Sequence, residues 1–276
     1  MKTIQDIRIR FIGAGNMAAS LMGGLLNKGL TASQITASDP GKNQRDYIES
    51  QFHIQTFDAN DAHFGIPDIA VIAVKPQLMK TVLQDVKPCL ERTQPLVISV
   101  AAGITTEQIS RWLDMEVAVV RTMPNTPALI GQGAIGMYAN QLVSAEQIQQ
   151  TEQIMDAVGT SLWVENEAQI DTVTALSGSG PAYFFMFMEY LQEAAEQLGL
   201  EPSDAALLTR KTAIGAALLA ERSPETLATL KQRVTSPNGT TAAALACFDQ
   251  LNIDQVIKQA ITAAHDRSKE LSQEFD

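Results

Sequence analysis

Two loops of this chain carry small, uncharged residues in patterns that could bind anions. Residues 234–241 (VTSPNGTT) stand directly before a helix-like segment. Their hydroxyl groups, their glycine and the N–H groups of a helix N-terminus could together hold a small carboxylate without a charged side chain. Residues 13–18 (GAGNMA) follow a β-branched run near the start of the chain. Together the loops indicate an enzyme that binds a dinucleotide and acts on a small carboxylate.

Residues 13–18 match the G-x-G-x-x-G/A fingerprint in the context that it requires, after a strand and at the start of a helix. Gly13 permits the tight turn, Gly15 lets the backbone approach a pyrophosphate, and Ala18 keeps the helix close to the strand. The alternative is a tight turn that holds no ligand. The alternation of strands and helices that follows favours the nucleotide site.

The end of the second predicted strand leaves the cofactor open. A carboxylate at the position of Asp39 usually accepts a hydrogen bond from the ribose 2′-hydroxyl and favours NAD over NADP. Lys42 and Arg45 follow, however, and either cation could contact a 2′-phosphate. All three could also be ordinary surface charges.

Three other loops follow predicted strands. Residues 73–76 (AVKP) and 100–103 (VAAG) are expected to face the nicotinamide, because ligands of open α/β sheets bind at the carboxyl ends of strands. Lys75 could contact the cofactor, orient the backbone or be solvated. Residues 123–127 (MPNTP) hold an Asn and a Thr on a turn with two prolines, which could serve a site or a structural corner.

Residues 177–181 (SGSGP) are predicted to form a second loop of hydroxyls and glycines, at the start of a long apolar helix. One such loop could be only an N-cap, but two favour an anion pocket. His53, His63 and His265 form neither a triad nor a metal-ligand spacing, so no metal site is expected. The lack of a positioned general base favours reduction of a protonated imine over oxidation of an alcohol.

Composition excludes several classes of function. A net charge of −11 argues against nucleic acid as a partner, since binding of its phosphates needs clustered Lys and Arg. Cys89 and Cys247 are the only cysteines, so a disulfide framework is not expected and a reducing cytoplasm is predicted. The N-terminus lacks a signal-peptide pattern, and no apolar run reaches the roughly 18–20 residues of a membrane span.

The pattern of the chain changes near residue 164. Before it, seven runs are predicted strands: 7–12, 35–38, 69–74, 96–100, 117–121, 135–139 and 161–164. Helical patterns between them predict an α/β, Rossmann-type, doubly wound parallel sheet, which makes 1–164 the dinucleotide-binding domain. After it, helices are predicted over 167–176, 181–198, 202–222, 224–234, 241–251 and 253–274. Residues 165–276 are therefore predicted to form an all-helical domain.

The helical domain is predicted to form a homodimer. The helix over 181–198 is apolar nearly all round at its start, and the Ala-rich stretch 205–220 favours close helix packing. A domain of about 110 residues has little interior in which to bury such helices. A monomer with an unusually apolar core is the alternative.

These motifs, in this order, resemble those of the pyrroline-5-carboxylate reductase family. The resemblance covers essentially the whole chain and rests on these segments: 11–18 (FIGAGNMA), 73–76 (AVKP), 123–127 (MPNTP), 177–183 (SGSGPAY) and 234–241 (VTSPNGTT). The last segment is the most specific, and its match extends to Phe248. The family commonly has Gly-Gly where this chain has Asn238 and Gly239, a tolerated change because Asn also adopts unusual backbone angles.

The resemblance implies reduction of L-1-pyrroline-5-carboxylate to L-proline, the last step of proline synthesis, by hydride transfer from NAD(P)H. It favours NADP(H), with NAD(H) as the alternative. It further implies a cytoplasmic enzyme with a Rossmann domain and a helical dimerisation and substrate-binding domain, whose dimers often assemble into rings. A reductase of a related cyclic imine is one alternative, and a protein that binds the nucleotide without turnover is another. A β-hydroxyacid dehydrogenase is disfavoured, because its catalytic Lys is replaced by the stretch 184–188 (FFMFM).

The resemblance also implies roles for individual residues. The cofactor-binding residues are Ile12, Gly13, Ala14, Gly15, Asn16, Met17, Asp39, Asn60, Ala73, Val74, Lys75, Pro76, Ala101 and Ala102. The substrate-binding residues are Ser177, Gly178, Ser179, Gly180, Ser236, Asn238, Gly239, Thr240 and Thr241. The loop 236–241 would hold the substrate carboxylate from the partner subunit. Thr241 is the expected catalytic residue, through a hydrogen bond between its hydroxyl and the ring nitrogen.

Overall fold

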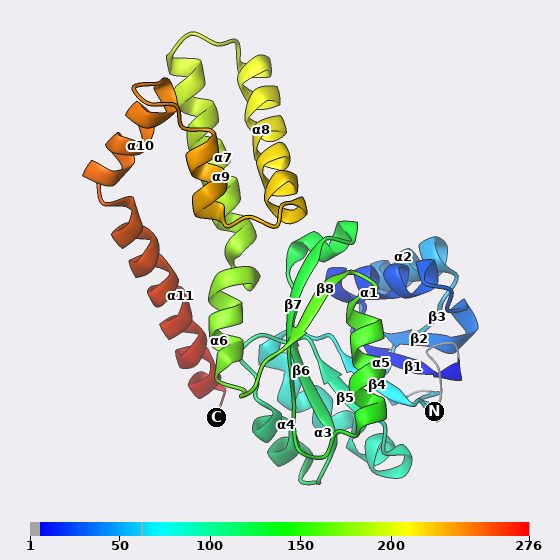
Figure 1. The fold of residues 1–276 in the computed structure, drawn as a ribbon. Helices are drawn as coiled ribbons and strands as arrows, with labels where there is room; N and C mark the ends of the chain where they lie inside the picture. Colours follow the sequence, from blue (N-terminus) through cyan, green and yellow to red (C-terminus); the bar gives the residue numbers. More distant parts are fainter. Residues whose placement is uncertain (1–5, 62, 276) are drawn as a thin grey trace. The chain divides into compact units, whose positions relative to one another are not determined.

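The computed structural model describes residues 6–61 and 63–275, and the chain divides into two compact units (Figure 1). The sheet unit comprises Met1–Ser179 with Ala264–Asp276, and the helical unit comprises Gly180–Ala263. The sheet unit thus includes residues from both sides of the boundary predicted between 164 and 165. That boundary between domains stays a prediction.

The sheet unit is built on one eight-stranded sheet with the order β3-β2-β1-β4-β5-β6-β7-β8. Neighbouring strands from β3 to β6 pair in parallel, β7 is antiparallel to β6, and β8 is parallel to β7. The strands are β1 (Ile9–Ile12), β2 (Ile35–Ser38), β3 (Gln55–Phe57), β4 (Ile69–Ile72), β5 (Leu96–Ser99), β6 (Val119–Met123), β7 (Gly133–Ala139) and β8 (Gly159–Trp163). The predicted Rossmann-type α/β class is confirmed.

Two details of the predicted sheet are wrong. It was expected to be parallel throughout, but β7 reverses direction after β6. Only the short 3-10 helix η3 (Thr126–Ile130) joins β6 to β7, and a parallel pair would need a crossover of a dozen or more residues. The edge strand β3, of three residues, was not predicted.

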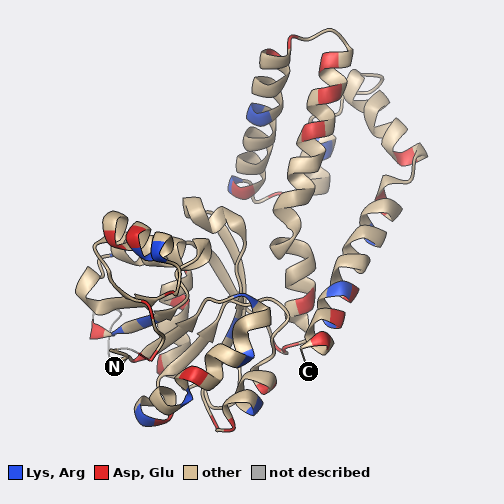
Figure 2. Ribbon diagram, turned by 180° about the vertical axis from the view of Figure 1, so that it is seen from behind, with Lys and Arg blue, Asp and Glu red and all other residues tan. Residues whose placement is uncertain are grey.

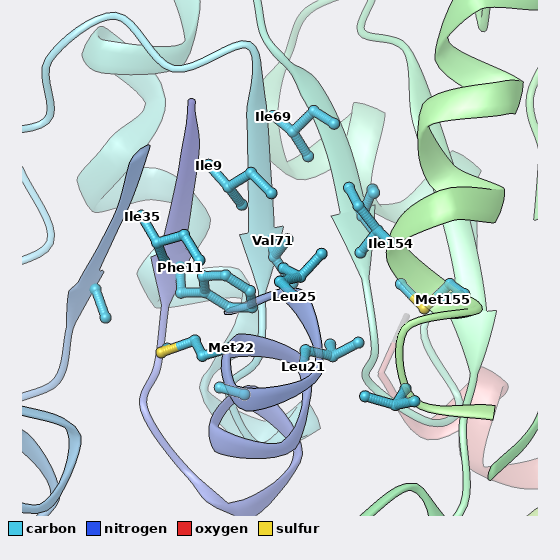
Figure 3. Close-up of a cluster of buried hydrophobic side chains, with 14 of the residues drawn as sticks. Ile9, Phe11, Leu21, Met22, Leu25, Ile35, Ile69, Val71, Ile154 and Met155 are labelled. Carbon is cyan, nitrogen blue, oxygen red and sulfur yellow. The ribbon is translucent and has the colours of Figure 1, made fainter. Parts of the chain in front are cut away.

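Helices cover both faces of the sheet, because successive strand residues point to opposite sides. Ile9 and Phe11 of β1 pack with α1 (Asn16–Asn27), α2 (Lys42–Phe52) and α5 (Ala145–Met155). Figure 3 shows this cluster, with Leu21, Met22 and Leu25 of α1 against the strands. Ile12 instead faces the cluster formed with α3 (Pro76–Thr93) and α4 (Thr106–Leu113). Both faces of the sheet are therefore buried.

The C-terminal end of the chain packs within the sheet unit. Here α6 (Gln169–Val173) and the end of α11 (Ile253–Glu274) meet, where Ser268 Oγ donates a 2.8 Å hydrogen bond to Asp171 Oδ1. The buried guanidinium of Arg121 on β6 forms ion pairs with Glu167, at 3.3 Å, and with Asp171, at 3.6 Å. The ion pairs of Arg121 hold the end of β6, from which the chain continues into η3. Elsewhere in this unit, a short 3-10 helix, η2 (Ala32–Gln34), precedes β2.

The helical unit contains α7 (Gly180–Gln197), α8 (Pro202–Arg222), α9 (Leu227–Arg233), α10 (Thr240–Gln250) and the first part of α11. Helices α7 and α8 pack against each other, and the rings of Phe187 and Phe248 lie 6.4 Å apart. All residues of this unit are described, and only Gly180, Ala205 and Thr209 are buried. Figure 2 shows long uncharged stretches along these helices. No helix within the described parts of the chain is long and apolar enough to span a membrane.

Candidate active site

The glycine-rich turn between β1 and α1 has the geometry of a phosphate-binding loop. Gly13 has φ +97°, and a Cβ there would lie 2.4 Å from the carbonyl oxygen of Ala73. Gly15 precedes α1 as its N-cap, where the structure shows no capping hydrogen bond from a described side chain. A Cβ on Gly15 would meet no atom of the described chain within 4 Å. The helix start is therefore uncapped by a described side chain and has open space beside Gly15, which fits a pyrophosphate.

A cavity of about 770 Å³ lies beside this turn, at the carboxyl ends of β1, β2 and β4. Open α/β sheets bind their ligands at such a place. The cavity is lined by Gly13, Gly15, Asp39, Pro40, Gln44, Asp58, Ala59, Asn60, Asp61, Ala73, Val74, Lys75, Leu78, Val82 and Asp85.

Seven of the predicted cofactor-binding residues line this cavity: Gly13, Gly15, Asp39, Asn60, Ala73, Val74 and Lys75. The other predicted cofactor residues do not line it: Ile12, Ala14, Asn16, Met17, Pro76, Ala101 and Ala102. The side chain of Ile12 is buried in the core, and Ala101 is buried after β5. Roles for these residues, through their backbone or in the bound state, stay predictions.

Asp39 connects the end of β2 to the glycine-rich turn. Its Oδ2 accepts a 2.9 Å hydrogen bond from the N–H of Ala14, and its Oδ1 accepts a 2.8 Å bond from the N–H of Gly41. Nearby, Ser38 Oγ donates to Asn60 Oδ1 at 2.8 Å. The carboxylate of Asp39 thus holds the glycine-rich turn through Ala14 and also forms part of the cavity lining.

The two cations that could contact a 2′-phosphate are engaged elsewhere. Lys42 Nζ lies 2.6 Å from Asp46 Oδ2, in an exposed pair on α2. Arg45 donates from one guanidinium nitrogen to the carbonyl oxygens of Asp39, at 2.8 Å, and Pro40, at 2.9 Å. Lys75 is the only lysine or arginine among the described residues that line the cavity. The same lining contains four carboxylates, those of Asp39, Asp58, Asp61 and Asp85.

Arg10 supports the loop that carries Asn60, a role that sequence reasoning missed. Its buried guanidinium donates to the carbonyl oxygens of Ala59, at 3.5 Å, and Asn60, at 3.3 Å, and lies 4.9 Å from the centre of the Phe57 ring. Burial lowers the pKa of Arg10 to about 10. An arginine inside an otherwise apolar strand was the signal available in the sequence.

The predicted loop before α10 is present in the helical unit. Asn238 has φ +61°, and the N–H of Gly239 donates a 3.0 Å hydrogen bond to the carbonyl oxygen of Ser236. A Cβ on Gly239 would lie 2.4 Å from Ser236 Oγ, so a larger residue there would displace this hydroxyl. Ser236 and Asn238 are exposed, and Thr241 is half-buried in the first turn of α10. This turn can present N–H and hydroxyl groups to a small anion.

Residues 177–181 do not form the open loop that was predicted, although the long apolar helix α7 begins at Gly180 as expected. Residues Thr174–Gly178 form a π-helical turn, η4, that runs on from α6. The N–H of Ser179 donates to the carbonyl oxygen of Thr174 at 2.9 Å, and Ser177 Oγ donates to the carbonyl oxygen of Val173 at 3.0 Å. These groups are used within the helix. Substrate contacts by Ser177, Gly178, Ser179 and Gly180 stay a prediction.

Pro181 lies in the first turn of α7, where a proline is tolerated, and Asn125 supplies a partner for the carbonyl oxygen of Ser177. Pro181 has no N–H to donate to the carbonyl oxygen of Ser177, four residues earlier. The buried side chain of Asn125 takes that role, donating from Nδ2 to this oxygen at 2.9 Å. Its Oδ1 accepts the N–H of Ala134 at 3.0 Å. Of the two readings of residues 123–127, Asn125 fits the structural corner.

Comparison with known proteins covers the whole chain. Residues 167–271 match the family model described as pyrroline-5-carboxylate reductase dimerisation, and residues 8–103 match that of coenzyme F420-dependent NADP oxidoreductases. A pyrroline-5-carboxylate reductase of Pseudomonas aeruginosa is 51% identical over 97% of this chain and 98% of its own length. The chain belongs to the pyrroline-5-carboxylate reductase family.

Solved structures of pyrroline-5-carboxylate reductases share this fold. That of Coxiella burnetii has a TM-score of 0.92 and 42% sequence identity, over 96% of this chain and 98% of its own. That of Plasmodium falciparum, solved with NADP bound, has a TM-score of 0.86 and 27% identity, over 98% of this chain and all of its own. The predicted family and fold class are confirmed.

The three histidines lie at separate places in the chain. His53 ends α2 with φ +55°, the ring of His63 stacks on Phe57 at 5.1 Å, and His265 lies beside Asp266. None of them lines the cavity described above. Among residues 6–61 and 63–275, no cluster of three or more His, Cys, Asp or Glu side chains could hold a metal ion.

Proposed function

We propose that this protein reduces L-1-pyrroline-5-carboxylate to L-proline with NAD(P)H, the last step of proline synthesis. The observation that carries the proposal is 51% identity to a pyrroline-5-carboxylate reductase over nearly the full length of both chains. The glycine-rich turn with open space above it, and the turn that ends at Thr241, support it with a place for each anion.

The reaction needs little acid–base chemistry from the protein. Bound NAD(P)H supplies a hydride to the ring carbon of an imine whose nitrogen is already protonated. In our proposal the N–H groups at the start of α1 hold the pyrophosphate, and residues 236–241 hold the substrate carboxylate. The protonated ring nitrogen donates a hydrogen bond to the hydroxyl oxygen of Thr241, which thereby orients the acceptor carbon. The protein contributes mainly position and electrostatics.

For the cofactor we propose NADP(H), with NAD(H) as the alternative. The match of residues 8–103 to a family of NADP oxidoreductases and the NADP bound to the Plasmodium falciparum relative support NADP(H). Asp39 in the cavity lining is the feature that keeps NAD(H) in consideration.

We further propose that the protein is a cytoplasmic homodimer formed through its helical unit, with dimers that assemble into rings. The match to a dimerisation family supports the helical unit as the interface. So does its exposed apolar surface, which includes Phe184, Phe185, Leu207 and Leu208. Cys89 and Cys247 are both free thiols, as suits a reducing compartment.

The test is oxidation of NADPH and of NADH by the purified protein, with L-1-pyrroline-5-carboxylate and a related cyclic imine as separate substrates. Formation of proline matched by loss of reduced cofactor supports the proposal. A folded dimer that binds the cofactor but reduces only the other imine would overturn the substrate assignment.

A further inference from the structure

The loop that follows β5, residues 100–105, adjoins the cofactor cavity. The N–H of Val100 donates a 3.2 Å hydrogen bond to the carbonyl oxygen of Ile72, the last residue of β4. The next residue after Ile72 is Ala73, which lines the cavity. Folds of this type place the adenosine ribose beside β2, so the nicotinamide half is expected on the other side of the glycine-rich turn, over β4 and β5. The loop 100–105 is therefore placed to face the nicotinamide.

The last turn of α11 packs against this loop within the sheet unit. A Cβ on Gly103 would lie 3.2 Å from Leu271 Cβ and 3.6 Å from Phe275 Cε2. Gly103 is buried and has φ +74°, so both side chains cover the loop where it has no side chain of its own. Phe275 also packs against the buried cluster that contains Ala101 and Ile104. The loop is thus held between the core of the sheet unit and α11.

Gln108 connects the far end of the loop to the same turn of α11. Its Nε2 donates a 2.7 Å hydrogen bond to the carbonyl oxygen of Ser272, and its Oε1 accepts a 2.8 Å bond from the N–H of Thr105. Thr105 is the N-cap of α4 and the last residue of the loop. The side chain of Gln108 is buried, and hydrogen bonds of buried groups are costly to leave unmade. One amide therefore couples the end of the loop to α11.

We propose that the last turn of α11 positions the loop 100–105 against the nicotinamide of the bound cofactor, with Leu271 as the positioning residue. Leu271 contacts neither cofactor nor substrate in this account and acts through the backbone of Gly103. Removal of its side chain leaves space beside Gly103, so the loop gains freedom and the nicotinamide is held less precisely for hydride transfer. The inference rests on the proposed use of NAD(P)H.

Hydrogen–deuterium exchange of the full-length protein tests this placement without turnover. NADP⁺ and 2′-phospho-ADP-ribose differ only in the nicotinamide. NADP⁺ should therefore slow exchange in residues 100–105 at least about threefold more than the fragment does. In Leu271→Ala this extra protection should be lost, while the affinity for the fragment changes by less than about twofold, because the adenosine half keeps its contacts.

Leu90→Ala is the matched control. Leu90 belongs to the same buried cluster as Ala101 and Ile104, so its truncation also lowers stability. It lies in the last turn of α3, however, and this helix starts at the carboxyl ends of the strands and runs back along them. Leu90→Ala should therefore keep the extra protection by NADP⁺. A purely structural role of Leu271 would make the two variants behave alike.

Turnover gives a second measurement. The kcat of imine reduction by Leu271→Ala should fall about tenfold, with the KM for NADPH changed by less than about twofold. Leu271→Met fills a similar volume and should restore kcat. If Leu271→Ala does not fold, Leu271→Val removes less volume and is measured in the same way.

Three results would overturn the proposal: equal protection of the wild type by NADP⁺ and by the fragment, unchanged extra protection in Leu271→Ala, or unchanged kcat in that variant. A wild type that shows the extra protection but reduces no imine would instead overturn the proposed function. The placement of the loop would then stand on the exchange measurements alone.

Discussion

The two units of this protein differ in how much of their apolar surface is buried. In the sheet unit, strand residues such as Ile9, Phe11 and Ile12 are fully buried between helices. In the helical unit, Phe184 is 72% exposed, and only three residues are buried. Burial of apolar area stabilises a fold by about 25 cal/mol per Å², so the sheet unit gains much more from its own packing than the helical unit does. The sheet unit therefore encloses a core of its own, while the helical unit leaves apolar surface exposed, which in our proposal a second copy covers.

The largest expected effect comes from placing a charge on the exposed apolar surface. Phe184→Glu should prevent dimer formation and lower kcat/KM by roughly 100-fold or more, because a buried unpaired carboxylate opposes association by several kcal/mol. Light scattering and the imine-reduction assay measure the two effects. Ile66→Glu is the control, since Ile66 is 74% exposed on the sheet unit and should tolerate the charge. A Phe184→Glu protein that is still dimeric and active would show that this exposed apolar surface is not needed for association.

Within the sheet unit, substitution of two glycines of the same turn should have different effects. A change at Gly13 should lower stability, and a change at Gly15 should weaken cofactor binding. Gly13→Ala places a Cβ 2.4 Å from the carbonyl oxygen of Ala73 at a φ of +97°, and should lower the free energy of unfolding by about 3 kcal/mol. Gly15→Ala meets no described atom within 4 Å and should leave the unfolding midpoint unchanged. It should nevertheless weaken binding of ADP-ribose, because the methyl group occupies the space for the pyrophosphate. Equal stability of the two variants would contradict this account of the turn.

In the helical unit, the test concerns the hydroxyl group of Thr241 and its effect on the rate of imine reduction. Thr241→Ala should lower kcat/KM by roughly 10–100-fold, about 1.4–2.7 kcal/mol, through loss of one hydrogen bond to the reacting ring. Thr241→Ser keeps the hydroxyl and should retain most of the activity. Unchanged kinetics in Thr241→Ala would take this residue out of its proposed role.

The sequence predicted best those parts that depend on local pattern. The backbone roles of Gly13 and Asn238 were predicted correctly, because a positive φ leaves its mark in residue type. The parts that depend on distant contacts were missed. The π-helical turn at Thr174–Gly178 reads as a glycine-rich loop, since nothing near Ser177 reveals that Asn125 will bond to its carbonyl oxygen. Arg10 was likewise missed, because its partners lie about fifty residues away.

The smallest expected effect tests that distant contact. Asn125→Ala leaves the carbonyl oxygen of Ser177 and the N–H of Ala134 without the partner that each has now, and should lower the free energy of unfolding by about 1–2 kcal/mol. Asn125→Asp is the informative control, because it keeps an acceptor for Ala134 but places a carboxylate oxygen against another oxygen. Urea unfolding should therefore rank the wild type above both variants. A stability equal to the wild type in Asn125→Ala would mean that the π-helical turn does not depend on the hydrogen bond from Asn125.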